Sequence, residues 1–152
     1  MGSRTVAPAS TSSTLCINSS ARRVPSSMSV SDATFVVTDV ETTGTSADQH
    51  RIMELGAVKV RDGEAVDRFQ QLVNPQRSVP GRITTLTGIT TGMVFEAPPA
   101  AEVLPAYLAF LGDGIFTAHN LSFDRSFINA ELQRTGREAL PNPALCTLRL
   151  AR

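Results

Sequence analysis

The sequence is short of the residues and patterns that would place it in several large protein classes. It has two cysteines in 152 residues, too few for a disulfide scaffold, and no cysteine and histidine cluster suited to zinc. No apolar run approaches the roughly 20 residues that span a bilayer, so we expect no membrane association. The low cysteine content favours a reducing, cytoplasmic setting as the simplest interpretation.

The sequence also lacks an excess of positive charge. Fourteen basic and fourteen acidic residues give a formal net charge of zero. Proteins that coat duplex DNA usually present a basic face, so a repressor or an architectural protein is disfavoured. A neutral chain can still be an enzyme that binds only a few nucleotides at one end of a strand.

Residues 1–31 contain no acidic side chain and are rich in serine, threonine and alanine. This composition is compatible with a disordered tail, with an organellar targeting peptide, or with a mis-annotated start upstream of Met28. The segment has no evident amphipathic helix, which favours the tail or the mis-annotated start. Residues 32–152 are expected to form one folded domain, since 41% hydrophobic and 18% charged residues overall are typical of globular proteins.

Along the chain, strand patterns come first and alternating helices and strands follow. Three segments rich in β-branched residues, with short turns between them, predict an antiparallel meander. A loop containing Pro80, Gly81, Gly88 and Gly92 is expected next. The predicted strands are 35–40, 52–60, 68–73 and 115–118, the predicted helices are 101–111 and 121–135, and residues 145–150 are expected to begin another strand or helix. This order predicts an α/β fold with a mixed sheet.

Two carboxylates stand at the end of the first predicted strand. Residues two apart share a face of a strand, so Asp39 and Glu41 project to the same side. Phe35 and Val37 share that side, which we take as the apolar, inward face. At ~3.3 Å per residue the two carboxylates are about 6–7 Å apart along the strand, within reach of a pair of metal ions. Acidic residues also occur at strand ends without a catalytic role, but two inward charges are costly without a cation.

A third carboxylate lies on the apolar side of the last long helix. Asp124 falls between Leu121 and Phe127 at helical spacing, and therefore within the apolar stripe. An interaction with the helix dipole would explain an exposed aspartate better than an inward one, and an inward carboxylate needs a partner. Oxygen ligands of this kind suit Mg²⁺ or Mn²⁺, so the three carboxylates predict a metal site.

Polar residues beside the carboxylates are candidates for substrate binding. The segment Thr42-Thr43-Gly44 can turn sharply and offer backbone N–H groups to a ligand. Asn120 is expected to cap the helix that carries Asp124, and His119 is expected to make a structural hydrogen bond or to contact the substrate. His50, in a polar loop, is expected to be solvated.

Four segments together resemble a known family. They are FVVTDVETTG (35–44), RIMELGAV (51–58), ITTLTGIT (83–90) and AHNLSFDRSFINAEL (118–132). In this order and spacing they are similar to the DEDD superfamily of 3′→5′ exonucleases, and most closely to its histidine-containing DEDDh branch, the DnaQ-like enzymes. That branch includes the proofreading epsilon subunit of bacterial DNA polymerase III and the exonuclease domain of the Gram-positive replicative polymerase. The resemblance runs from about residue 34 to residue 152.

The resemblance implies a ribonuclease H-like mixed sheet and hydrolysis of terminal phosphodiester bonds at the 3′ end of DNA. It assigns Asp39, Glu41 and Asp124 as ligands of two Mg²⁺ or Mn²⁺ ions, one activating water and one stabilising the leaving 3′-oxygen. It assigns Thr42-Thr43-Gly44 to the terminal 3′-hydroxyl and Thr87-Gly88-Ile89 to the terminal base. The implied partners are the 3′ end of single-stranded DNA and a DNA polymerase subunit.

One part of the family pattern is absent. The third motif is a histidine, the general base, followed five residues later by an aspartate, the fourth carboxylate, but no histidine or aspartate follows Asp124. We therefore expect a truncated exonuclease domain, missing this motif and a helix over the sheet, with weak or no activity. The alternatives are a degenerate module that binds a strand end or a polymerase, and an RNA-directed member of the superfamily. Glu54 matches a recurrent family position and is expected to be structural rather than catalytic.

Overall fold

The computed structural model describes Arg22 and residues 25–152, and it confirms the predicted α/β fold with a mixed sheet. The five strands lie in the order β3-β2-β1-β4-β5, with β1 to β3 antiparallel and β4 and β5 parallel to β1. Their bounds are β1 Thr34–Thr42, β2 Ile52–Arg61, β3 Glu64–Leu72, β4 Ile115–Ala118 and β5 Ala144–Cys146. A short 3₁₀-helix, η1 (Val30–Asp32), precedes β1. Most of residues 1–31 lie outside the described residues, so the interpretation of that segment stays a prediction.

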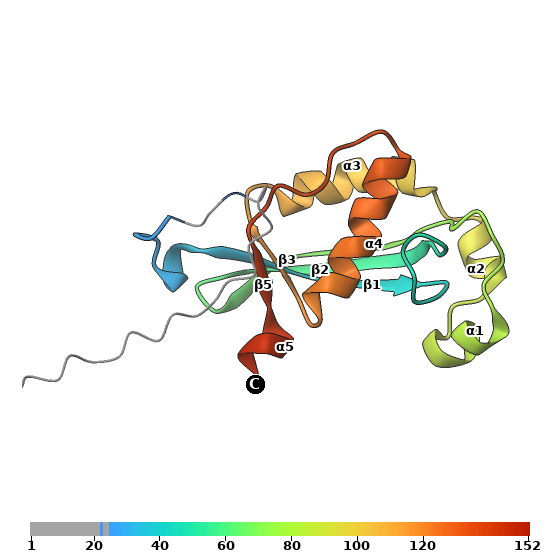
Figure 1. Ribbon diagram of the computed structural model, residues 1–152, viewed down its shortest axis with the longest axis horizontal. Helices are drawn as coiled ribbons and strands as arrows, with labels where there is room; N and C mark the ends of the chain where they lie inside the picture. Colours follow the sequence, from blue (N-terminus) through green and yellow to red (C-terminus); the bar gives the residue numbers. More distant parts are fainter. Residues whose placement is uncertain (1–21, 23–24) are drawn as a thin grey trace, which may run out of the picture.

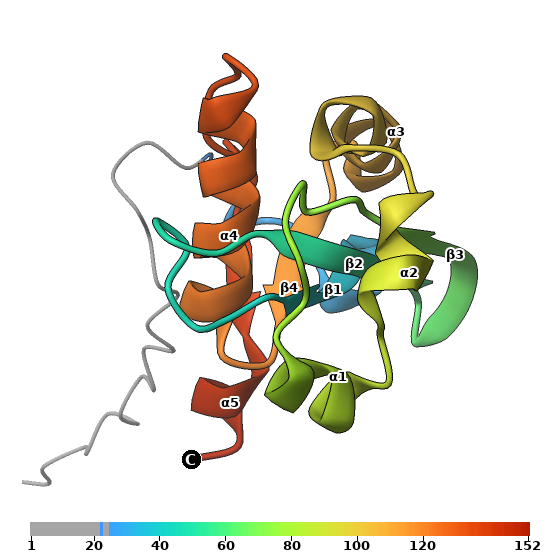
Figure 2. The same cartoon turned by 90° about the vertical axis from the view of Figure 1, so that its right-hand side faces the viewer.

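Two helices cover one face of the sheet. These are α3 (Ala100–Leu111) and α4 (Leu121–Arg134), which lie on the same side of the strands (Figure 1). Three shorter helices, α1 (Gly81–Thr87), α2 (Thr91–Phe95) and α5 (Thr147–Leu150), lie toward the ends of the sheet, and α1 and α5 lie away from the α3 side (Figure 2). No helix in the described part of the chain is long and apolar enough to cross a membrane.

The burial of β1 corrects one prediction. Val36 and Val40 point toward α3 and α4 and are at most 5% exposed, whereas Val37 on the other side is 41% exposed. Asp39 is exposed on that same open side and Glu41 is half-buried, so the prediction that this pair lies on the inward face is wrong. Three consecutive apolar residues follow the first residue of the strand, so alternation along the sequence could not decide which side the helices cover.

The predicted loop at residues 80–92 is also wrong, because it contains the helices α1 and α2. The residues that suggested a loop lie at helix ends instead. Gly88 ends α1 in the left-handed conformation, with φ 78°, and Pro80 precedes the first turn of that helix. The Thr90 side chain caps α2 by accepting a hydrogen bond from the Met93 N–H at 3.2 Å.

The other elements match their predictions closely, except at the third strand and the last segment. Strand β3 begins at Glu64 rather than at residue 68, because a two-residue turn joins it directly to β2. That turn is Asp62-Gly63, with φ values of 50° and 77°. Residues 64–67 are exposed and show no apolar alternation that would have indicated a strand. Residues 145–150 contain both alternatives, the end of β5 followed by α5.

The main core lies between the sheet and the helices α3 and α4. Its largest fully buried side chains include Tyr107, Phe116 and Phe127, one each from α3, β4 and α4. Burial of an aromatic side chain contributes about 1.5–3 kcal/mol to stability. The Tyr107 hydroxyl shares a hydrogen bond of 2.8 Å with the Thr38 hydroxyl, which joins α3 to β1. This core fixes α4 over the carboxyl end of β1, where the acidic residues lie.

Candidate active site

The three predicted carboxylates come together at the carboxyl ends of two neighbouring parallel strands. Asp39 and Glu41 lie near the end of β1, and Asp124 lies in the first turn of α4, directly after β4. The pairing of β1 with β4 runs only from Phe35 to Val37 on the β1 side. Beyond that point α4 approaches β1. The carboxyl edge of parallel strands is a common position for ligand sites in α/β folds.

Asp124 is the buried member of this group. Its side chain is 3% exposed, which confirms that it lies on the packing side of its helix. Its Oδ1 accepts a hydrogen bond from the backbone N–H of Val40 at 3.1 Å. The ladder between β1 and β4 has ended by this point, so the carboxylate satisfies a buried donor of the sheet. Asp124 therefore fastens α4 to β1.

The carboxylates influence one another electrostatically. Burial raises the pKa of Asp124 from its ordinary 3.8 to about 6; the charges of Asp39 and Glu41 act in the same direction, and the Val40 N–H opposes them. The pKa of Glu41 is also raised, first by burial and then by the charges of Asp39 and Glu54. We call Asp39, Glu41, Glu54 and Asp124 the acidic cluster. A cation beside the cluster would relieve this repulsion.

Glu54 was expected to be only structural, and the structure places it within the acidic cluster. It is the cross-strand partner of Glu41 in the pairing of β1 with β2. Its Oε1 accepts a hydrogen bond of 2.8 Å from the Gln70 side-chain amide on β3. Knowledge of the strand register would have revealed that Glu54 faces Glu41. The register is irregular between Glu41 and Thr42, so the sequence alone did not indicate which residues of the two strands are paired.

The protein atoms by themselves do not enclose a metal ion. Among Arg22 and residues 25–152, no three His, Cys, Asp or Glu side chains are close enough together to hold one. Mg²⁺ usually keeps several waters and binds one or two carboxylates together with substrate phosphate oxygens, rather than a complete protein cage. The donors here are all carboxylate oxygens, and their mutual repulsion favours a divalent cation. The donor chemistry of the acidic cluster therefore fits Mg²⁺ or Mn²⁺.

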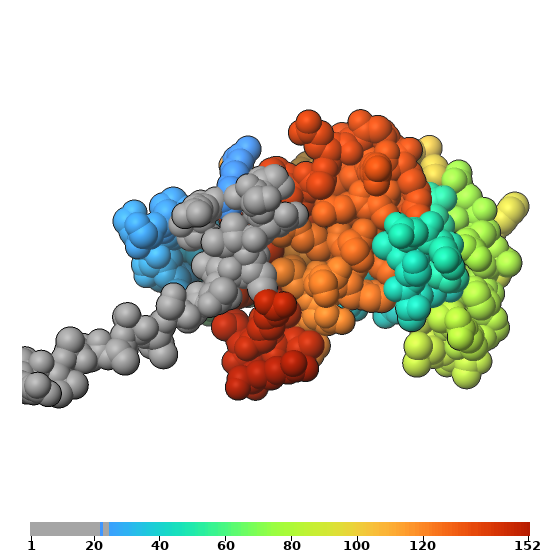
Figure 3. Space-filling model, viewed as in Figure 1, coloured from blue at the N-terminus to red at the C-terminus, as the bar shows by residue number. Residues whose placement is uncertain are grey.

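The turn that follows β1, Thr42–Gly44, is held by contacts within its own loop. The Thr42 hydroxyl donates to the Gly44 carbonyl at 2.6 Å. The Thr43 N–H donates to the Arg51 carbonyl at 2.9 Å, and the Arg51 N–H donates to the Thr43 hydroxyl at 3.1 Å. The 43–51 loop lies at the surface between α4 and the segment that contains α1 and α2 (Figure 3). These bonds close the loop at its base.

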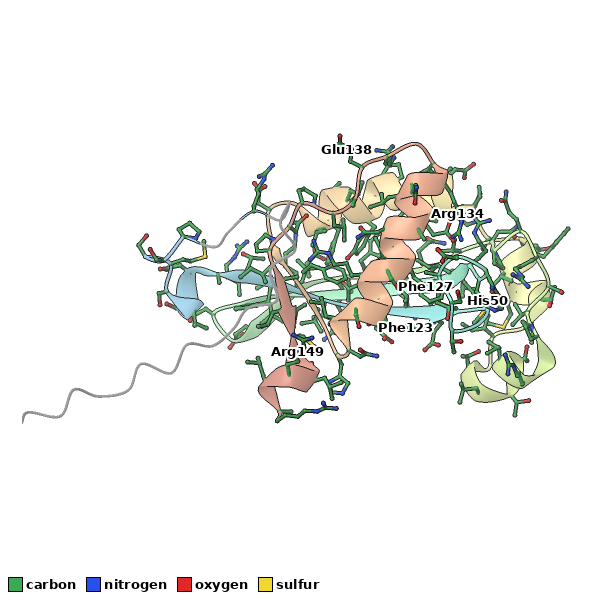
Figure 4. The ribbon with its side chains drawn as sticks, viewed as in Figure 1. His50, Phe123, Phe127, Arg134, Glu138 and Arg149 are labelled. Carbon is green, nitrogen blue, oxygen red and sulfur yellow. The ribbon has the colours of Figure 1, made fainter. Side chains whose placement is uncertain are left out.

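His50 is not simply solvated, as the sequence suggested. Its Nδ1 lies 3.3 Å from the Thr43 hydroxyl, and its ring lies against Gly44 so closely that a Cβ there would overlap it. The side chain lies in the loop that follows β1 (Figure 4). The loop turns back on itself, which brings residues 43 and 50 together although the sequence separates them.

Gly44→Ala is expected to destabilise the protein by about 1 kcal/mol, because the new methyl group would displace the His50 ring from Thr43. In a His50→Ala background the same change should be neutral or slightly stabilising, since the space is then open. Urea unfolding of the four proteins measures this coupling as a double-mutant cycle. An equal cost in both backgrounds would contradict the contact.

The predicted base-binding segment Thr87-Gly88-Ile89 reaches the same region. Together with Glu54 and Met93 it lines an open cavity of about 540 Å³. Ile89 is 5% exposed and belongs to a second, smaller core cluster, so its backbone is firmly placed. The structure therefore brings this segment next to the acidic cluster, with the cavity between the two.

His119 and Asn120 are exposed between β4 and α4. The His119 Nδ1 lies 3.1 Å from the Thr147 hydroxyl of α5, which agrees with a structural hydrogen bond. Asn120 occupies the N-cap position of α4, as predicted, but within the described residues its side chain makes no capping hydrogen bond. The reason is its left-handed backbone, with φ 63°; its Oδ1 instead accepts a 3.3 Å hydrogen bond from the Ser122 hydroxyl.

Comparison with known sequences decides the family. The sequence model of the RNase T family of exonucleases matches residues 36–152. The chain belongs to this exonuclease family. It is 46% identical over 121 residues to a DNA polymerase III of the PolC type from Halalkalibacterium halodurans. It is 49% identical over 119 residues to the PolC-type polymerase of Oceanobacillus iheyensis. These matches cover 80% and 78% of the chain, which spans only about 8% of the length of either relative.

Solved structures support the same assignment. The product-bound structure of exonuclease I superposes with a TM-score of 0.72 at 16% identity, covering 78% of this chain and 31% of that one. Exonuclease X in complex with 5′-overhanging duplex DNA gives a TM-score of 0.61 at 32% identity, covering 78% and 62%. The ribonuclease H-like mixed sheet and the DEDDh resemblance expected from the sequence are thus confirmed.

Proposed function

We propose that this exonuclease-family chain acts on the 3′ end of single-stranded DNA and uses two Mg²⁺ or Mn²⁺ ions. One observation carries the proposal: the buried Asp124 carboxylate accepts the N–H of Val40, the residue between Asp39 and Glu41, so the three carboxylates meet at the carboxyl end of β1. Three coupled carboxylates from two separate elements are costly to ionise without a cation. In a member of an exonuclease family, a scissile phosphate is the natural further ligand of that cation.

In this proposal Asp39, Glu41 and Asp124 hold the ions against the scissile phosphate. When bound, such ions activate water and stabilise the leaving 3′-oxygen. Asp124 contributes one carboxylate oxygen while its Oδ1 accepts the Val40 N–H, which holds the first turn of α4 against β1. The aspartate and the two β1 carboxylates are thereby pre-positioned for the phosphate.

The terminal nucleotide lies, in this proposal, between the turn Thr42–Gly44 and the segment Thr87-Gly88-Ile89. The turn is closed by its own hydrogen bonds, which would present it to the 3′-hydroxyl in one fixed conformation. The cavity beside Glu54 has room for the terminal base, which would pack on the Thr87–Ile89 side. His119 and Asn120, exposed at the start of α4, are positioned to contact the neighbouring phosphate or sugar.

DNA is proposed as the substrate because the relatives at 46% and 49% identity are DNA polymerases and exonuclease X, at 32%, is described in complex with duplex DNA. A DNA polymerase subunit is the proposed protein partner for the same reason. Hydrolysis of matched DNA and RNA oligomers separates this proposal from an RNA-directed activity.

A second candidate function is binding of a strand end or a polymerase without hydrolysis. One observation favours it: among Arg22 and residues 25–152, no three His, Cys, Asp or Glu side chains lie close enough together to hold a metal ion by themselves. A site that does not bind its metal ions would still offer the strand end a surface but would lack the activated water.

Metal-dependent binding and hydrolysis are the expected results for the first candidate. Single-stranded DNA with a 3′-hydroxyl should bind more tightly in Mg²⁺ or Mn²⁺ than in EDTA, and more tightly than the same strand with a 3′-phosphate. A 5′-labelled strand should be shortened only when Mg²⁺ or Mn²⁺ is present. Such hydrolysis would exclude the second candidate, and absence of both metal-dependent end binding and hydrolysis would exclude the first.

A further inference from the structure

Helix α4 carries a second buried carboxylate, which the proposed reaction does not use. Glu131 is 1% exposed and lies about two helical turns after Asp124, on the same side of the helix. Asp124 accepts the N–H of Val40 on β1, and the Glu131 Oε1 accepts the N–H of Ile52 on β2 at 3.3 Å. The helix is therefore fastened to both strands, on either side of the loop that joins them.

Arg51 provides most of the compensation for the Glu131 charge. Its Nε donates to Glu131 Oε1 at 2.7 Å and its Nη2 donates to Oε2 at 2.9 Å, a bidentate pair. Arg134 adds a third contact, with its Nη1 3.3 Å from the same Oε1. A buried carboxylate with this many partners is well compensated, and removal of Arg51 would leave it only Arg134 and the Ile52 N–H.

The same side chains hold the loop that contains the proposed 3′-end turn. Arg51 is bonded to Thr43 through both its backbone N–H and its carbonyl. The Arg134 Nη2 donates to the Ala47 carbonyl in the middle of the loop at 2.6 Å. The position of the Arg51 side chain, fixed by Glu131, is thus transmitted through the Arg51 backbone to Thr43.

We propose that Glu131 and Arg51 form a positioning pair for the turn Thr42–Gly44, and thereby for the 3′-terminal nucleotide. The identity of that ligand rests on the proposed function; the effect on the turn does not. Asp124 has its own bond to β1, and fully buried Phe127 anchors α4 in the core. Loss of the pair should therefore disturb the turn more than the carboxylates that are proposed to bind metal.

Three variants test the pair: Glu131→Gln, Arg51→Met, and the double variant with Met at both positions. The double variant replaces the ion pair by apolar side chains of similar length, a change that usually keeps the fold stable. Each should weaken binding of DNA with a 3′-hydroxyl about tenfold or more, because small displacements of a binding segment are costly. Mn²⁺ affinity, measured without DNA, should change less than about twofold. Arg137→Met, at an exposed arginine after the same helix, is the control.

Amide hydrogen exchange provides a readout that does not depend on nucleic acid. The amides of Thr43 and Arg51 should lose protection in all three variants, while those of Val40 and Phe127 keep it. A loss spread equally over the four amides, or normal end binding by the double variant, would overturn the proposal. If the unmodified chain itself fails to bind 3′-hydroxyl ends, the proposed function fails, and the amides of Thr43 and Arg51 still decide whether the pair positions the turn.

Discussion

Asp124→Asn is expected to stabilise the metal-free protein above pH 6. The pKa of Asp124 is raised on folding from 3.8 to about 6, so its contribution to stability is complete below the lower value and is lost as the pH rises through the higher one. Asparagine cannot ionise, and its Oδ1 can still accept the Val40 N–H. Allowing for solvent screening on the open side of the site, the gain at pH 8 is on the order of 1–2 kcal/mol.

Addition of Mn²⁺ should reverse this order. A ligand that binds only the folded state stabilises it by about 2.7 kcal/mol at one hundred times its dissociation constant. The unmodified protein should gain this stabilisation, whereas the Asp124→Asn protein should lose most of it together with metal-dependent DNA binding. At pH 5, where Asp124 is largely protonated, the effect of Mn²⁺ should be much smaller.

Urea unfolding at pH 5 and pH 8, in EDTA and in Mn²⁺, measures both effects of the Asp124 change. Asp113→Asn is the matched control, because Asp113 is an exposed aspartate at the opposite end of β4 and pairs only at the surface, with Arg22. That change should leave stability within about 0.5 kcal/mol under all four conditions. Equal stability of the unmodified and Asp124→Asn proteins at pH 8 in EDTA would contradict the prediction that the ionised Asp124 carboxylate destabilises the metal-free protein.

Asp39→Asn is expected to abolish metal-dependent function without changing the metal-free fold. Asp39 is exposed on the open face of β1, so its replacement should alter metal-free stability by no more than about 0.5 kcal/mol. A catalytic metal ion contributes several kcal/mol of charge stabilisation, so any hydrolysis should fall by about 10²-fold or more. Mn²⁺-dependent binding of the 3′-hydroxyl strand should be lost as well.

Two measurements test the prediction for Asp39: the affinity for Mn²⁺, from a titration, and the affinity for the labelled strand. Asp67→Asn, at an exposed aspartate of β3 outside the acidic cluster, provides the control and should retain both activities. The two substitutions are expected to differ in one respect. Both should remove metal binding, but only replacement of the buried Asp124 should alter the stability of the metal-free protein. Normal Mn²⁺-dependent end binding by the Asp39→Asn protein would refute its assignment as a ligand.

Much of the candidate site could be predicted because its signals are local. Helical spacing alone indicated that Asp124 lies on a buried side, and the structure agrees. The motifs around Asp39 and Asp124 indicated the family, and the family match confirms it. The side of β1 that faces the helices could not be predicted in the same way, because the first half of the strand is apolar on both sides. The prediction for Asp39 and Glu41 failed for that reason, although the two residues do share a face.

By itself, the sequence determined the order of the strands and of the two long helices, the positions of the three carboxylates along them, and the family, because each depends on residue type and on spacing within one element. Only the tertiary structure decided that Glu54 joins the acidic cluster, that His50 lies on Gly44, and that Glu131 meets Arg51. These contacts depend on the strand register and on how α4 packs against the sheet. Both are set by the packing of the whole core, which no local pattern in the chain encodes.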